Sequence, residues 1–181
     1  IKFMEQSINL KILTNKIIFT VSLLIFSRIG FFIPIPGLDH DSLYYNVSRN
    51  GFVNFLNIIS GGGFSTLGIF ALGIGPYINA SIMIQALSKT LPSLQKLRED
   101  GGNGYRKINQ ITRYLATGLA FMQSIGILIW IKPYVFDWNL YFIFETITCL
   151  ITGSTIIMWI GELISEQGIG NGQSLLIFQN I

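Results

Sequence analysis

Charged residues, cysteine and histidine are scarce in this chain of 181 residues, and each scarcity excludes a class of protein or site. Only 12% of the residues are charged, whereas ordinary soluble domains carry about 25%. The single cysteine, Cys149, excludes a disulfide framework and a thiolate metal site, and we interpret it as a packing residue. The single histidine, His40, has no second histidine with which to form a cluster. We therefore expect no enzyme, no metal and no cofactor.

Two further patterns resemble chemical sites only superficially. The glycine-rich run 168–172 lacks the lysine and the Ser/Thr of a Walker A motif, so we interpret it as a tight turn. Glu162 and Glu166 are one helical turn apart at the end of an apolar run. Their position favours a solvated or ion-paired helix end over a pair of catalytic carboxylates.

Apolar residues, by contrast, are abundant. Half of the residues are hydrophobic, and several apolar runs approach the roughly 20 residues that cross a bilayer as a helix. The composition predicts an all-α, polytopic membrane protein with one transmembrane domain. We expect spans at about 17–33, 76–91, 109–131 and 140–164, and the start of a fifth at 173–181. We expect residues 1–16 to form a separate amphipathic surface helix, with no cleavable signal peptide, and the whole chain to be a fragment.

The stretch 60–87 is apolar but is interrupted by Gly73, Gly75 and Pro76. Proline removes an amide donor and restricts the residue before it, so a helix cannot continue through this point. We predict a short helix from Phe64 to Leu72 and a longer one from Pro76. A broken helix within a membrane survives only where protein or a water-filled cavity satisfies the freed backbone groups. The break therefore indicates a pathway through the membrane.

The basic residues predict the orientation of the chain, because cytosolic loops of membrane proteins carry an excess of lysine and arginine. With the amino terminus inside, only Arg49 and Lys132 lie in outside loops. The basic residues then on or near the inner side are Lys2, Lys11, Lys16, Lys89, Lys96, Arg98, Arg106, Lys107 and Arg113. In this topology the short helix enters from the outer side and turns back, tethered by Gly61, Gly62 and Gly63.

Ile74, Ile78 and Ile82 are four residues apart and share one helix face. This face is either a packed stripe or a hydrophobic constriction of the kind that gates a pore by excluding water. A secondary solute transporter is the alternative, because such proteins also use broken helices. A transporter requires converging polar groups, and Asn79 and Gln85 lie off this face.

Four groups of motifs follow one another in order through nearly the whole chain: Phe32-Ile33-Pro34-Ile35-Pro36-Gly37; 69–74 with Pro76-Tyr77-Ile78; 106–110 with Thr112-Arg113-Tyr114; and 158–162 with 168–172. These motifs resemble the SecY family, the channel subunit of the Sec protein translocase, and of its members most resemble the plastid-encoded type. The resemblance implies the amino-terminal half of a ten-helix channel with a re-entrant plug helix, which translocates preproteins across a membrane and inserts membrane proteins.

The resemblance also implies roles for individual residues. The pore ring would contain Ile74, Ile78 and Ile177, and the lateral gate and its control would involve Asn79, Ile82 and Arg113. The plug would be formed by Phe64, Ser65, Thr66, Leu67, Gly68, Ile69, Phe70, Ala71 and Leu72. Its hinges would be Gly61, Gly62, Gly63, Gly73, Gly75 and Pro76. Gln173 departs from the family, whose members often carry an apolar residue at this position.

The implied partners are SecE-like and SecG-like small membrane subunits, a SecA-type motor ATPase or the ribosome, unfolded preproteins and membrane lipid. No direct contact with nucleic acid is implied. The thylakoid membrane of a plastid is the expected location and a bacterial plasma membrane is the alternative, with the amino terminus on the stromal or cytosolic side.

Overall fold

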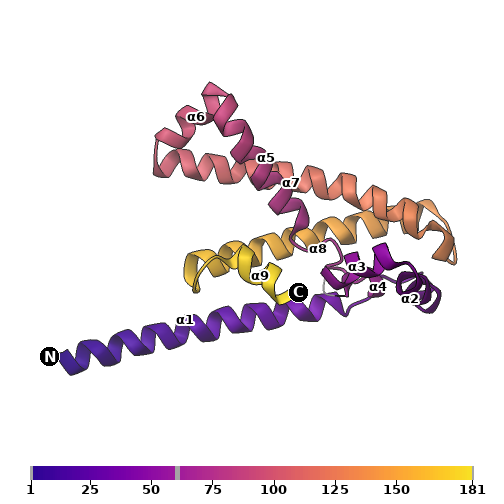
Figure 1. Cartoon of the computed structure of the whole chain (residues 1–181), viewed down its shortest axis with the longest axis horizontal. Coiled ribbons are helices and arrows are strands. Elements are labelled where there is room, and N and C mark those ends of the chain that lie inside the picture. The colour runs from indigo at the N-terminus through magenta and orange to yellow at the C-terminus, as the bar shows by residue number, and fades with distance from the viewer. Residues whose placement is uncertain (1, 60–61, 181) are drawn as a thin grey trace.

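Three long apolar helices extend along the molecule and form its frame: α1 (Lys2–Phe31), α7 (Gly102–Ile131) and α8 (Leu140–Gln167) (Figure 1). The computed structural model describes residues 2–59 and 62–180. Within this part of the chain, these three helices contain the segments long and apolar enough to cross a membrane. The expected all-α, multi-pass membrane fold is confirmed.

Helix α1 continues without a break from Lys2 to Phe31. The prediction of a separate surface helix over residues 1–16 is therefore wrong. The physical reason is that neither glycine nor proline occurs between Lys2 and Ser27, so nothing ends the helix where the composition changes from polar to apolar. The part Lys11–Phe31 is long and apolar enough to cross a membrane.

Helix α5 (Gly75–Thr90) begins at the predicted break, with Pro76 in its first turn, where a missing amide donor costs nothing. Its 16 residues span about 24 Å at 1.5 Å per residue, less than the roughly 30 Å of a hydrocarbon core. The predicted span 76–91 is thus not a complete crossing by itself. The preceding segment 67–74 is non-helical and leads directly into α5.

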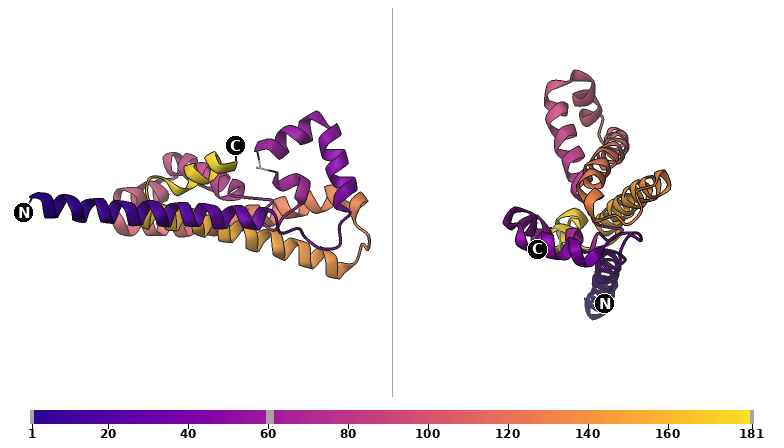
Figure 2. Two further views of the ribbon diagram at one scale, coloured as in Figure 1. Left: turned by 90° about the horizontal axis from the view of Figure 1, so that it is seen from below. Right: turned by 90° about the vertical axis from the view of Figure 1, so that its right-hand side faces the viewer.

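The short elements gather at the two ends of the frame (Figure 2). The helices α2 (His40–Arg49), α3 (Gly51–Ile59) and α4 (Gly63–Thr66) lie where α1 and α7 end and α8 begins. Asp39 caps α2 by accepting a hydrogen bond from the amide of Ser42 at 3.2 Å. At the opposite end, α6 (Pro92–Glu99) connects α5 to α7. A 3-10 turn, η1 (Lys132–Tyr134), follows α7, and α9 (Gly172–Asn180) follows α8.

Two clusters of buried apolar side chains form the core. The first lies among α5, α7, α8 and α9, and the second lies at the end occupied by α2 and η1. The segment 67–74 contributes to both clusters: Phe70 and Ile74 belong to the first, and Leu67 and Ala71 belong to the second. The non-helical segment is therefore the part of the chain that joins the two cores.

Candidate functional site

The candidate site is built on the segment 63–78, where the chain changes from turns to helix α5. The predicted helix from Phe64 to Leu72 is wrong, because only Gly63–Thr66 is helical. Leu67 has a positive φ of 40° and ends this single turn, and Gly73 has a φ of 54°. Left-handed geometry of this kind cannot propagate a right-handed helix. The chain from Leu67 to Ile74 forms two turns of its own, in which the Ala71 amide donates to the Gly68 carbonyl and the Gly73 amide to the Phe70 carbonyl, and it bonds to neighbouring elements as well.

The exit from α1 provides some of these partners. The Leu67 carbonyl accepts from the Ile35 amide at 3.1 Å, and the Ile69 amide donates to the Ile33 carbonyl at 3.0 Å. The Thr66 hydroxyl donates to the Phe31 carbonyl at 3.1 Å. The Pro-Ile-Pro-Gly motif thus ends α1 and also holds the broken segment in an extended pairing.

Two glycines make this close approach possible. A Cβ atom at Gly68 would collide with the carbonyl group of Phe31, and a Cβ at Gly30 would collide with the ring of Phe70. Phe31 and Phe70 also meet edge to face, with ring centroids 6.1 Å apart. Any larger residue at either glycine would separate the segment from α1.

Helix α8 holds the segment at its other end. The Ser154 hydroxyl donates to the Gly73 carbonyl at 3.3 Å, and the carbonyl of Ile69 lies against Gly153, where a Cβ would collide with it. Gly153 and Ser154 lie near the middle of α8, so the broken segment reaches the middle of the frame and α5 begins there. Protein contacts therefore satisfy the backbone that the break frees, as a membrane interior requires.

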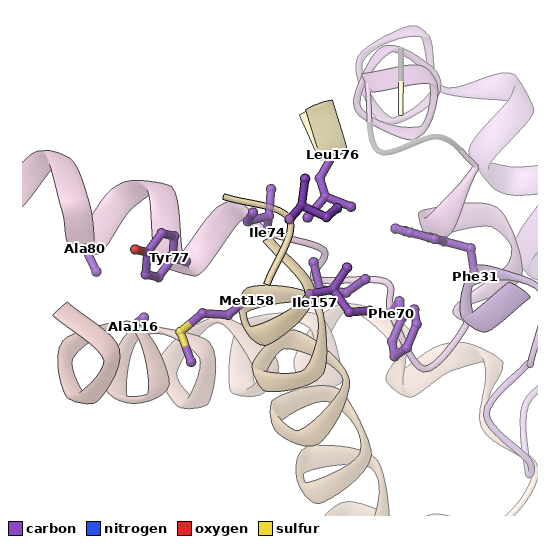
Figure 3. Packing of buried hydrophobic residues seen from close by; sticks show 11 residues of the cluster. Phe31, Phe70, Ile74, Tyr77, Ala80, Ala116, Ile157, Met158 and Leu176 are labelled. Carbon is purple, nitrogen blue, oxygen red and sulfur yellow. The ribbon is translucent and has the colours of Figure 1, made fainter. Parts of the chain in front are cut away.

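The isoleucine face of α5 is packed at its start and open further along. Ile74 is only 4% exposed and lies close to Leu176 of α9 and Ile157 of α8 (Figure 3). Ile78 is half-buried, whereas Ile82 is 59% exposed. The packed-stripe interpretation therefore describes Ile74, and the open end remains available to line a space.

The other residues of the expected ring and gate also come from α5 and α9. Ile177 of α9 is 38% exposed. Asn79 of α5 is exposed, like Ile82. None of these three side chains is enclosed in the cores.

Gly62 and Gly63, which precede the broken segment, form a tight corner. Gly62 has a φ of 89°, and its amide donates to the Asn57 carbonyl at 2.8 Å. The side-chain oxygen of Asn57 accepts from the Ser65 amide at 2.9 Å, so this residue joins α3 to α4. Gly63 is buried against the ring of Phe31. Gly61 and the side chain of Phe64 lie outside the described residues.

A polar cavity lies beside α5, on the side that carries Tyr77 and Ser81. The side-chain amide of Gln173 on α9 donates to the hydroxyl of Tyr77 on α5 at 3.1 Å. Both residues line two adjoining spaces of about 370 and 460 Å³, which also share Tyr105 and Asn109 of α7. Gln173 thus makes a specific contact between α9 and α5.

Arg113 and Glu162 join α7 to α8 near this cavity. Arg113 Nη2 lies 2.8 Å from Glu162 Oε2, and Arg113 Nε donates to Glu162 Oε1 at 2.8 Å. The Arg113 side chain is 49% exposed and that of Glu162 only 12%. The prediction of an ion-paired helix end is confirmed for Glu162. Among the described residues, no three His, Cys, Asp or Glu side chains are grouped to hold a metal ion.

The sequence interpretation missed Gly153 and Ser154, which anchor the segment, and Tyr77 as the partner of Gln173. The available signal was weak: a pair of small residues in the otherwise apolar run 140–164 is compatible with many kinds of close packing. The choice of partner depends on contacts between residues far apart in the chain, since 81 positions separate Gly73 from Ser154.

Comparisons with known proteins agree with the arrangement. The SecY family model matches residues 68–181. The protein translocase subunit SecY of Pyropia yezoensis is 62% identical over 170 residues, covering 93% of this chain and 41% of the relative. Those of Guillardia theta and Synechococcus elongatus are 53% and 49% identical over 97% and 93% of the chain, respectively. The chain spans about 41% of the length of the first of these relatives.

Two solved structures share the fold. One is described as a protein conducting channel, and it covers 91% of this chain with a TM-score of 0.65 and 18% identity. The other is Sec61 in a canine ribosome-channel complex from the endoplasmic reticulum, with a TM-score of 0.65, 19% identity and the same 91% coverage. The chain covers 35% of the length of each.

Proposed function

This chain belongs to the SecY family, and we propose that it forms the amino-terminal part of a protein-conducting channel. Its substrates would be unfolded preproteins that cross the membrane and membrane segments that leave sideways into lipid. The algal and cyanobacterial relatives are named as translocase subunits, which supports a transport role over a catalytic one. The names of these relatives also favour a channel over a secondary solute transporter, which was the alternative that the sequence left open.

The observation that carries the proposal is the broken crossing. Residues 67–74 reach the middle of α8 without forming a helix, and α5 continues the crossing with an isoleucine face that is partly open. We propose that Ile74, Ile78 and Ile177 form the amino-terminal share of an apolar constriction. Apolar contact is non-directional, so such a ring accepts any passing sequence while excluding water.

We assign the plug role to the predicted residues 64–72 and extend it to α3. The reason for the extension is that α3 (Gly51–Ile59) supplies most of the helix in this region and is joined to α4 by Asn57. Plug movement would break the few hydrogen bonds between 66–69 and 31–35. Gly62, between α3 and residues 64–72, and Gly73, at the far end of these residues, both have positive φ and are the proposed hinges.

The lateral gate is proposed to lie on the open face of α5, where Asn79 and Ile82 are exposed. Arg113 would control it through the ion pair with Glu162, because this pair sets α7 against α8. We further propose SecE-like and SecG-like subunits, a SecA-type motor or the ribosome as partners, and a plastid thylakoid location with the amino terminus in the stroma.

Site-specific crosslinking tests the proposal. A photoreactive residue at Ile78, in the full-length protein, should crosslink to a preprotein stalled during translocation. The same probe at Ile129, which is 66% exposed on α7 outside the proposed pore, is the matched control. Equal labelling at both positions, or none at Ile78, would contradict the proposed pathway.

A further inference from the structure

Helix α9 carries a glutamine at each end, and both side chains make contacts with other helices. Gln173 donates to the Tyr77 hydroxyl of α5. Near the other end, Gln179 Nε2 donates to the Leu24 carbonyl of α1 at 2.8 Å. Its Oε1 accepts from the Ser27 hydroxyl at 3.0 Å, a donor that it shares with the Leu24 carbonyl at 2.7 Å, and Ser27 is only 1% exposed. An amide within an apolar environment is costly unless its donor and acceptor are both used, and those of Gln179 are.

The chain entering α9 is attached to the same face of α1. The Ile169 amide donates to the Thr20 hydroxyl at 3.1 Å, and Thr20 in turn donates to the Lys16 carbonyl. Thr20 and Ser27 are seven residues apart, which places them on one side of α1 about 10.5 Å apart along its axis. Two polar contacts therefore determine the height of α9 along α1.

Helix geometry relates these contacts to Ile177. Residues two apart on a helix point in nearly opposite directions, since each residue turns by about 100°. Gln179 contacts α1, so Ile177 points away from α1. Residues four apart share a face, so Ile177 lies on the same side as Gln173, which contacts α5. Both contacts thus direct Ile177 towards the helix that carries Ile74 and Ile78.

We propose that Gln179 is a positioning residue for the pore ring: held by Ser27 and Leu24, it fixes the rotation and height of α9 and so places Ile177. Gln173 helps to fix the same rotation and height of α9 through its hydrogen bond to Tyr77 of α5. The inference rests on the proposed function only where it assigns Ile177 to a pore ring. The hydrogen bonds that attach α9 to α1 do not depend on the proposed function.

The test replaces Gln179 in the full-length protein by leucine, which keeps a similar volume and is favourable in a membrane. Spin labels at two exposed positions, Met122 of α7 and Phe178 of α9, report the distance between these helices by pulsed electron resonance. Passive ion conductance of the channel in lipid vesicles reports how completely the pore ring blocks the passage of ions. Gln123→Leu, which removes an exposed glutamine of α7, is the matched control.

We expect Gln179→Leu to broaden or shift the distance distribution and to raise the ion conductance by about threefold to tenfold, the range set by one or two intramembrane hydrogen bonds. Ser27→Ala should have a smaller effect of the same kind, because Leu24 still holds the amide. The two changes together should equal Gln179→Leu alone. Gln123→Leu should alter neither measurement.

A distance distribution that is unchanged in Gln179→Leu would overturn the inference, whatever happens to the conductance. A changed distribution with unchanged conductance would keep the positioning of α9 but contradict the assignment of Ile177 to the ring. Loss of thermal stability with both measurements unchanged would also overturn the inference, because the contact would then only stabilise the fold.

Discussion

Replacing Gly153 by alanine should release the broken segment from α8. The added methyl group would lie 2.8 Å from the carbonyl carbon of Ile69 and 3.1 Å from its Cγ2, whereas non-bonded carbons pack at about 3.5–4.0 Å. The neighbour on one side is backbone, so no side-chain rotation relieves the collision. The segment must move away from α8.

The magnitude follows from the contacts that would be lost. Overpacking of this kind costs about 1–3 kcal/mol. The hydrogen bond from Ser154 to Gly73, already 3.3 Å long, would be stretched beyond its useful range, at a further cost of about 0.6–1.7 kcal/mol. Gly126→Ala is the matched control, because no heavy atom lies within 4 Å of the new methyl group on α7. We expect the two variants to differ in free energy of unfolding by about 2–4 kcal/mol.

The assay is unfolding of the purified protein in mixed micelles, followed by circular dichroism as the denaturing detergent is increased. Gly126→Ala should be as stable as the wild type or slightly more stable, since alanine favours a helix by about 0.5–1 kcal/mol over glycine. If Gly153→Ala unfolds at the same point as Gly126→Ala, the segment does not lie against α8 as described.

Two further predictions concern the ends of the frame. In a double-mutant cycle of Arg113→Gln and Glu162→Gln, we expect a coupling energy of about 1 kcal/mol or less, because Arg113 is half-exposed. Arg113→Gln should lower the free energy of unfolding more than Glu162→Gln does, since it leaves the more buried carboxylate unpaired. Purely additive effects of the two changes on the free energy of unfolding would contradict the ion pair. The hydroxyl and the amide of Ser42 hold the pKa of Asp39 below its ordinary value by hydrogen bonding to the carboxylate. Because the folded pKa is the lower one, this stabilisation is complete above the unfolded value of about 3.9 and is lost as the pH falls through the folded value. The stability advantage of the wild type over Asp39→Ala should therefore persist at pH 6 and disappear in strong acid, and a pH-independent difference would argue against the cap.

Features that depend on local chemistry could be read from the sequence. The break at Gly73, Gly75 and Pro76 follows from backbone sterics, and α5 begins there. The long spans α7 and α8 follow from continuous apolar composition. The pairing of Glu162 was expected from its place at a helix end, although its partner Arg113 is 49 positions away and could not be named.

Features that depend on distant partners could not be read in the same way. Residues 64–72 look helical by composition, but the Leu67 carbonyl and the Ile69 amide bond to Ile35 and Ile33 instead, because Gly68 permits a close approach to Phe31. The isoleucine spacing of α5 is the same at every position, yet Ile74 is buried and Ile82 is not. Ile74 is buried because it packs in one cluster with Leu176 of α9, and the spacing of residues within α5 does not predict where α9 lies.

The attachment of residue 73 to residue 154 has a consequence for how the protein is made. The two positions are 81 residues apart, and synthesis at about 5–20 residues per second takes roughly 4–16 s to cover that distance. During this interval α5 is synthesised, but Ser154, whose hydroxyl donates to the Gly73 carbonyl just before α5, is not yet present. A helix of 16 residues cannot settle across a bilayer alone, so the crossing is completed only after α8 has been inserted. The crossing that contains α5 is therefore completed out of sequence order, after the later helix α8.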